Sequence, residues 1–176
     1  MGLSENEGIH EAGDTKYRSF STAIRDHLRD NPSEKIVVFA FFRGTLAYLK
    51  RRLEADGIPC ASIVGGMATQ VVDNRQVDAK TAEIDRFRSP EGPNVLLSSE
   101  VGSEGIDLQF ARMVFNYDLP WNPMRVEQRI GRIDRMGQEN KTIIVGHFAT
   151  EGTIDDRILN RLYERRSFLH AHVFLS

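Results

Sequence analysis

Short apolar runs and longer stretches with helical apolar spacing alternate along most of the chain. Residues 35–40 form a nearly continuous apolar run, which is typical of a strand covered on both faces. Phe20, Ile24 and Leu28 recur at helical spacing and predict an amphipathic helix over residues 15–30. Similar runs predict further strands at 59–64, 95–97, 113–117 and 142–148. Similar spacing predicts further helices at 43–56, 72–88 and 123–135 and another that begins near 152.

This alternation predicts a mostly parallel central sheet with helices on both faces, a three-layer α/β fold. We expect one domain over residues 15–170, a disordered leader or cloning remnant at 1–14, and a truncated tail at 171–176. In such folds ligands gather beyond the carboxyl ends of the strands. Three predicted strand ends carry unusual residues, namely Phe41-Phe42-Arg43, Gly65-Gly66 and Ser98 to Gly102.

The composition narrows the class of protein. A chain of 176 residues can bury a real core, and its net charge of −2 means that any nucleic-acid contact needs a local basic patch. The single cysteine, Cys60, excludes an internal disulfide framework and fits a reducing compartment. We find no signal peptide and no apolar run long enough to span a membrane. The five histidines show no zinc spacing, so we expect no metal site.

The strongest candidate chemistry lies in the predicted helix that begins after Asn122 and Pro123, which are typical of an N-cap and a first helical residue. If the helix continues at about 100° per residue, its apolar face carries Val126, Ile130 and Ile133. The opposite face is mostly polar and carries Gln128, Gly131, Arg132 and Arg135. Two convergent guanidinium groups suit the negative charge of a triphosphate undergoing hydrolysis. A solvated basic face with a chance glycine explains the same residues without any function.

Two other stretches carry weaker signals. Residues 98–108 follow a buried strand and combine two hydroxyls with Gly102 and Gly105, which lets the backbone approach phosphate oxygens closely. They also include Asp107, whose carboxylate suits a ribose hydroxyl. Taken alone, these residues are explained better by a glycine-rich turn without function, because such strand-to-helix turns are common. The only tryptophan, Trp121, stands between Pro120 and Pro123 in a rigid elbow, where we expect it to be a packing anchor.

In this order, the pieces resemble the C-terminal RecA-like lobe of a superfamily 2 helicase. Residues 98–108 resemble motif V of that group, residues 128–138 resemble motif VI with its Q-x-x-G-R-x-x-R pattern, and residues 35–43 resemble motif IV. Gly137-Gln138 and the Trp121 elbow are similar to the SWI/SNF-related DNA translocases, and within them to the bacterial RNA-polymerase-associated helicase-like branch. The resemblance covers roughly residues 15–169, and its co-ordered motifs are far more specific than any one of them.

The resemblance implies that Arg132 and Arg135 act as arginine fingers on the phosphates of ATP, which is used with Mg²⁺, and that Gln128 helps to place them. It also implies that double-stranded DNA is a partner, with RNA polymerase or another nucleoprotein complex as a further partner of this branch. A cytoplasmic, nucleoid-associated location in a bacterium follows from the same resemblance.

For the neighbouring loops the resemblance implies that Gly102, Gly105 and Asp107 line the nucleotide, and that Ser99 and Gly66 lie toward the DNA backbone. Three positions depart from the pattern of many relatives and weaken the individual contacts, namely Val64, Glu100 and Asp107.

Two parts of a helicase motor are missing from the sequence. It contains no G-x-x-x-x-G-K-[ST] phosphate cradle and no Asp-Glu pair to hold magnesium. In this family both belong to the N-terminal lobe, so we expect a motor lobe that is inactive as an ATPase until that lobe of the same parent chain is present. The alternatives are a non-catalytic RecA-like module that docks a partner or nucleic acid, and an RNA helicase of the same superfamily.

Overall fold

The computed structural model describes residues 7–67, 69–72, 75–134, 143–149 and 171–175. Its helices are α1 (Glu7–Asp30), α2 (Arg43–Ala55), α3 (Ala79–Arg88) and α4 (Pro123–Ile130). Its strands are β1 (Ile36–Phe39), β2 (Cys60–Ile63), β3 (Thr69–Val72), β4 (Arg75–Asp78), β5 (Val95–Ser98), β6 (Met113–Asn116), β7 (Ile144–Ala149) and β8 (Ala171–Leu175).

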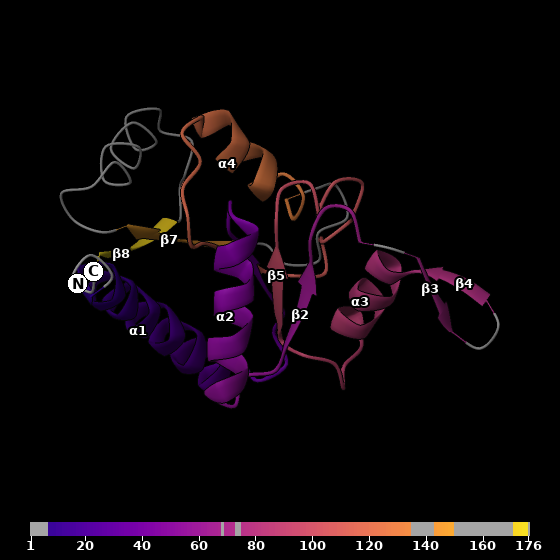
Figure 1. Cartoon of the computed structure of the whole chain (residues 1–176), viewed down its shortest axis with the longest axis horizontal. Coiled ribbons are helices and arrows are strands. Elements are labelled where there is room, and N and C mark those ends of the chain that lie inside the picture. Colours follow the sequence, from indigo (N-terminus) through magenta and orange to yellow (C-terminus); the bar gives the residue numbers. More distant parts are fainter. Residues whose placement is uncertain (1–6, 68, 73–74, 135–142, 150–170, 176) are drawn as a thin grey trace, which may run out of the picture.

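Six of these strands form one sheet in the order β2-β5-β1-β6-β7-β8, and every neighbouring pair is parallel. The predicted RecA-like arrangement, a parallel sheet with helices on both faces, is therefore confirmed. The central strand β1 pairs with β5 on one side and β6 on the other, with Ile36 opposite Val95 and Met113. All carboxyl ends consequently meet at one edge of the sheet, above which α4 lies (Figure 1).

Alternating side chains on the central strands build the two halves of the core. Ile36 and Val38 of β1 join the cluster formed with α1 and α2, whereas Val37 and Phe39 join the cluster formed with α3. Because successive side chains of a strand point to opposite faces, a continuously apolar strand must be covered on both. In the first cluster Phe20 of α1 lies edge-on to the rings of other elements, namely Phe115, Tyr117 and Phe148.

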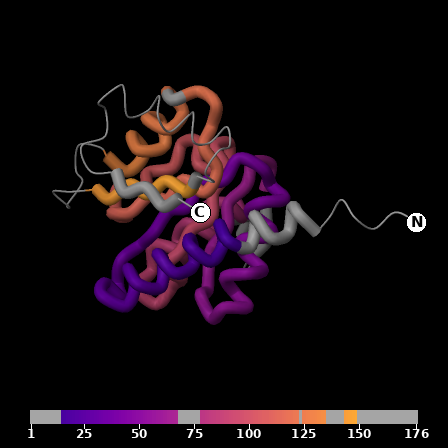
Figure 2. Tube along the Cα trace, turned by 90° about the vertical axis from the view of Figure 1, so that its left-hand side faces the viewer, coloured from indigo at the N-terminus to yellow at the C-terminus, as the bar shows by residue number. Residues whose placement is uncertain are grey.

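The first helix is longer than predicted, since α1 begins at Glu7 instead of residue 15. It runs beside β7 and β8, at the end of the sheet opposite β2 (Figure 1), and Figure 2 shows α1 beside β7 from a second direction. Among the described residues no helix is both long and apolar enough to cross a membrane.

The helix expected over residues 72–88 is wrong in its first part. Residues 69–72 and 75–78 form the antiparallel hairpin β3–β4, in which Thr69 pairs with Asp78, and α3 begins only at Ala79. Asp78 ends the hairpin and caps the helix, because its side chain accepts a hydrogen bond from the backbone N–H of Lys80. The apolar spacing that predicted one helix over residues 72–88 therefore spans two different elements.

The arginine helix is also shorter than predicted. Helix α4 ends at Ile130, and Gly131 is its C-cap with φ −61° and ψ −9°. Beyond it the backbone tightens into turns, in which Arg132 N–H donates to Arg129 O at 3.2 Å and Ile133 N–H donates to Ile130 O at 2.9 Å. Gly131 is therefore not a helix-interior glycine, and the helical rotation used to place the later residues does not hold past Ile130.

Two expectations concern the end of the chain. Residues 171–175, expected as a tail, form strand β8, which pairs with β7 at the edge of the sheet. The helix expected from about residue 152 lies outside the described residues, as do Arg135, Gly137 and Gln138.

Candidate functional site: a cationic cavity at the carboxyl edge of the sheet

The start of α4 is set by local sequence, as predicted. Asn122 is the N-cap, its side-chain oxygen accepts from the N–H of Met124 at 3.0 Å, and Pro123 occupies the first helical position. The elbow before it differs from the prediction in one respect. Trp121 is 78% exposed and is not a packing anchor, whereas Leu119 of the same elbow is buried. Leu119 therefore packs in the interior and anchors the elbow, whereas the indole of Trp121 faces solvent.

The loop after β5 that carries Gly102 and Gly105, called the glycine loop from here on, is tightly packed. A Cβ on Gly102 would lie 2.5 Å from the carbonyl oxygen of Ile63, so only glycine fits where this loop crosses the end of β2. The Gly102 N–H donates to the hydroxyl of Ser99 at 3.0 Å. Gly105 has φ +74°, a backbone conformation that favours glycine. These contacts explain both glycines by the shape of the loop, and the predicted contact with a nucleotide stays a prediction.

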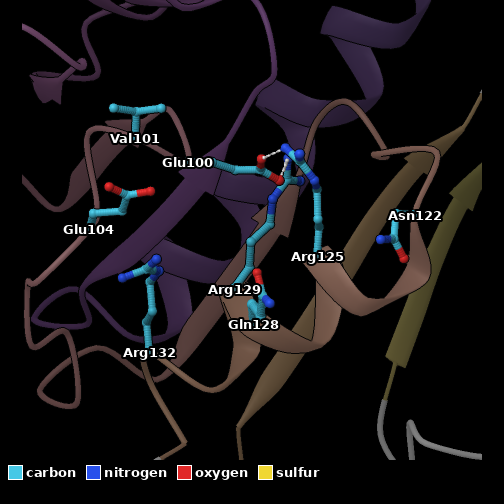
Figure 3. A pocket seen from close by; sticks show the side chains of 8 residues that line it. All are labelled: Glu100, Val101, Glu104, Asn122, Arg125, Gln128, Arg129 and Arg132. Carbon is cyan, nitrogen blue, oxygen red and sulfur yellow. Dashed lines mark hydrogen bonds and ion pairs between the residues drawn. The ribbon is translucent and has the colours of Figure 1, made fainter.

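Between this loop and α4 lies a cavity of about 390 Å³ (Figure 3). Its polar lining comes from the glycine loop and from α4 with its flanking residues, namely Glu100, Glu104, Asn122, Arg125, Gln128 and Arg132, and the buried Arg129 also borders it. Arg132 is partly buried, and its Nη1 donates to the carbonyl oxygen of Ser103 at 2.8 Å. The structure thus brings predicted residues Gln128 and Arg132 together beside the glycine loop.

A buried arginine that the sequence analysis missed holds this edge together. Arg129 is 1% exposed, and its Nη1 donates to Asn116 Oδ1 of β6 at 2.7 Å and to the carbonyl oxygen of Asp118 at 3.0 Å. Its Nη2 lies 3.1 Å from Oε1 of Glu100, and its guanidinium stands over the ring of Phe39. Arg129 therefore ties α4 to the sheet and to the glycine loop.

The pairing of Arg129 with Glu100 is electrostatic rather than well directed. Among the described residues neither Nη2 of Arg129 nor Oε1 of Glu100 makes a well-aligned hydrogen bond, although the two atoms are close enough for an ion pair. Burial lowers the pKa of Arg129, and the nearby Glu100 carboxylate opposes that shift. Because a guanidinium starts from so high a pKa, Arg129 stays charged at neutral pH.

The signal that could have revealed Arg129 was present in the sequence. On an α-helix, residue 129 lies about 60° from Val126 by rotation, so it belongs beside the apolar face and not with Gln128. A charged residue on the buried face of a helix needs a partner. That partner, Glu100, was noted only as a departure from related sequences.

Behind Arg129 lies His147 of β7, which is 1% exposed. Its Nδ1 is 3.3 Å from the amide nitrogen of Asn116, so Asn116 links the imidazole to the guanidinium. Burial, and secondarily the charge of Arg129, lowers the pKa of His147 to about 4. His147 is therefore neutral at physiological pH and adds no second positive charge behind the cavity.

The other predicted contact residues lie on the surrounding loops. Asp107 accepts from the N–H of Gln109 at 3.1 Å, and Ser99 is nearly buried with its hydroxyl used inside the loop. Gly66 is exposed with φ +74° in the turn after β2. Their predicted roles toward ribose and DNA stay predictions, and Arg135 lies outside the described residues.

The donors that line the cavity fit phosphate oxygens and do not fit a metal ion. Guanidinium and amide N–H groups of Arg125, Gln128 and Arg132 are hydrogen-bond donors for an anion. In the described part of the chain no group of three or more His, Cys, Asp or Glu side chains comes together as a metal site. A phosphate group therefore suits the arginine and amide groups of this cavity.

Comparison with known proteins shows the family of the chain. Residues 19–137 match the family model described as the helicase conserved C-terminal domain. The uncharacterized ATP-dependent helicase YqhH of Bacillus subtilis is 41% identical over 132 residues, which are 75% of this chain and 22% of YqhH. The RNA polymerase-associated protein RapA of Sodalis glossinidius is 41% identical over 114 residues, or 64% of this chain and 11% of RapA.

Solved structures show the same fold. The C-terminal part of the Fun30 ATPase domain superposes with a TM-score of 0.68 at 23% identity, covering 84% of this chain and 44% of that one. The Escherichia coli DEAD-box protein SrmB superposes with a TM-score of 0.65 at 24% identity, covering 91% and 84%. The chain spans less than a quarter of the length of the curated relatives YqhH and RapA. It belongs to the helicase conserved C-terminal domain family, as a RecA-like lobe of the SWI/SNF-related bacterial branch that includes RapA and YqhH.

Proposed function

We propose that this chain is the C-terminal motor lobe of an ATP-dependent DNA translocase and that Arg132 acts as an arginine finger. The observation that supports this most directly is the position of Arg132 and Gln128 in one cavity between the glycine loop and α4. In the proposal, Arg135 is a second finger, and Gly102, Gly105 and Asp107 line the nucleotide.

The lobe acts only when another lobe presents ATP. A guanidinium stabilises the charge that spreads over the transferred phosphoryl group, and this can accelerate hydrolysis by about 10³- to 10⁵-fold. The chain carries no phosphate cradle of the G-x-x-x-x-G-K-[ST] type and no Asp-Glu pair. ATP and Mg²⁺ are accordingly held mainly by an N-terminal RecA-like lobe of the parent chain. ATP closes the two lobes, and opening after hydrolysis advances the DNA.

The proposed partners extend beyond the N-terminal lobe. Double-stranded DNA runs along the loops that carry Gly66 and Ser99. Because RapA is described as RNA polymerase-associated, RNA polymerase or another nucleoprotein complex is a proposed partner of the parent protein. A cytoplasmic, nucleoid-associated location in a bacterium belongs to the same proposal.

The decisive test uses the full-length parent protein with DNA present. Arg132→Ala should lower kcat for ATP at least 100-fold while the Kd for ATP changes less than about fivefold, because the finger acts mainly in the transition state. The matched control is Arg51→Ala, which removes an exposed arginine from α2 and should leave kcat unchanged. Equal loss of kcat and of ATP binding would assign Arg132 to ground-state binding.

The isolated chain gives an independent check. It should show no ATP hydrolysis above background, with or without DNA, because it supplies fingers without a cradle. Turnover that copurifies with the chain and survives Arg132→Ala would contradict the proposal.

A further inference from the structure

Glu100 stands between two arginines that differ greatly in exposure. Its Oε1 is 3.1 Å from Nη2 of Arg129, whose side chain is 2% exposed, and its Oε2 is 2.5 Å from Nη1 of Arg125, whose side chain is 50% exposed. Figure 3 shows both guanidinium groups converging on the one carboxylate. The two ion pairs are therefore not equivalent, since one is locked inside the protein and the other faces water.

The buried ion pair is fixed by its surroundings. Arg129 also donates to Asn116 Oδ1 and to the carbonyl oxygen of Asp118, so it cannot turn away without leaving buried acceptors unpaired. Glu100 is thereby kept at the mouth of the cavity whatever Arg125 does. Within the described part of the chain the guanidinium of Arg125 has no such second partner, and an exposed ion pair contributes little to stability. Exchange of Arg125 from Glu100 to another anion is consequently easy.

The same two residues line the cavity that holds Arg132 and Gln128. A phosphate-bearing ligand that enters this cavity meets the negative charge of Glu100, which repels it. It also meets Arg125 with a hydrogen-bonding edge already occupied by that carboxylate. Glu100 and the ligand thus compete for one guanidinium.

We propose that Glu100 is a built-in competitor for the phosphate-bearing ligand of this cavity: it holds Arg125 in the absence of ligand and releases it to the phosphate when ligand binds. Arg129 keeps Glu100 in place throughout, and Arg125 becomes a further cationic contact beside Arg132. This inference rests on the proposed function, because it takes the cavity to be a phosphate site.

The test measures binding of inorganic tripolyphosphate to the 176-residue chain by calorimetry at low ionic strength, where charge effects are least screened. Glu100→Gln keeps a side-chain oxygen near Arg129 but removes the competing charge. It should raise the affinity about fivefold. Arg125→Met alone should lower the affinity about threefold, and in the double variant Glu100→Gln should gain no more than the general effect of removing one negative charge, which Glu104→Gln measures.

Glu104→Gln is the matched control, because Glu104 lines the same cavity and loses the same charge without being paired to Arg125 in the structure. Any gain from Glu104→Gln comes from the general field, so it should persist when Arg125 is methionine. A double-mutant cycle for each pair then separates release of Arg125 from simple charge reduction.

The outcomes are distinct. A gain from Glu100→Gln that persists undiminished without Arg125, or no gain at all, overturns the competitor role. If Glu100→Gln does not fold, Arg125→Met still decides, since unchanged affinity in that variant overturns the inference. Binding that is indifferent to Arg132→Ala in every variant refutes the phosphate cavity that this inference assumes, whereas the arginine-finger proposal is decided by kcat of the full-length parent protein. Binding that needs Arg132 but shows no coupling between Glu100 and Arg125 refutes only the competitor.

Discussion

The two arginines on Glu100 predict very different stability effects for the same kind of substitution. Arg129→Met removes a guanidinium that is 1% exposed and leaves Asn116 Oδ1 and the carbonyl oxygen of Asp118 without their donor. Breaking a buried ion pair from one side costs about 3–5 kcal/mol. Glu100 is 20% exposed and keeps Arg125, so we expect the lower end of this range, about 3 kcal/mol.

Arg125→Met provides the matched comparison, because it removes the other arginine from the same carboxylate. Its side chain is 50% exposed, and exposed ion pairs contribute about 0–1 kcal/mol. The assay is urea unfolding of the 176-residue chain followed by circular dichroism, with the m-value checked for two-state behaviour. In thermal unfolding the Arg129 variant should lose about 6–12 °C, from about 2–4 °C per kcal/mol for a chain of this size.

A further variant tests the reason for the loss. In a Glu100→Gln background residue 100 has no negative charge that would be left without its buried partner, so the cost of Arg129→Met in free energy of unfolding should fall by about 1 kcal/mol. Costs of Arg129→Met and Arg125→Met that agree within about 0.5 kcal/mol would refute the argument, because burial would then not distinguish the two ion pairs.

Three further predictions follow from burial and backbone geometry. His147 has a pKa of about 4 when folded, below the ordinary value of 6.5, so the unfolded chain binds the extra proton and stability should fall as the pH drops from 6.5 towards 4. The loss attributable to His147 should be about 2 kcal/mol at pH 5 relative to pH 7, and His147→Gln should unfold with a correspondingly weaker pH dependence over that interval. Gly102→Ala forces a methyl group against the carbonyl oxygen of Ile63 and should cost about 1–3 kcal/mol in urea unfolding, whereas Gly44→Ala, with nothing near the added atom in α2, should be neutral or stabilising. Trp121→Ala should change the free energy of unfolding by less than about 0.5 kcal/mol, because the indole is 78% exposed, and a large loss would restore the packing-anchor interpretation.

The site divides into residues that sequence could place and residues that it could not. Asn122 and Pro123 predict the start of α4, because an N-cap and a proline at the first helical position depend only on adjacent residues. The Q-x-x-G-R pattern predicts Gln128 and Arg132, which the structure brings to one cavity. Arg129 occupies a variable position of that pattern, so pattern matching passes over it. Its importance depends on Glu100, which reaches it only when the loop after β5 folds over α4.

Errors in the predicted elements have a common physical origin. Apolar spacing predicts a helix over residues 72–88 because it depends only on side-chain type and contains no information on which backbone groups pair across a hairpin. The same spacing carries α4 past Ile130, where the backbone tightens instead. The exposure of Trp121 is a third case, since an indole beside two prolines has the same sequence whether it packs or not.

The sequence by itself determined the layered parallel sheet, because strands that are apolar on both faces, separated by amphipathic helices, have few other ways to bury their side chains. It also determined where α4 begins, since capping is a matter of adjacent residues. Only the tertiary structure decided that Arg129 is buried, that Glu100 joins it to Arg125, and that a cavity opens beside Arg132. Those features depend on contacts between residues distant in the chain, and no local pattern specifies which charges meet when the strand ends converge.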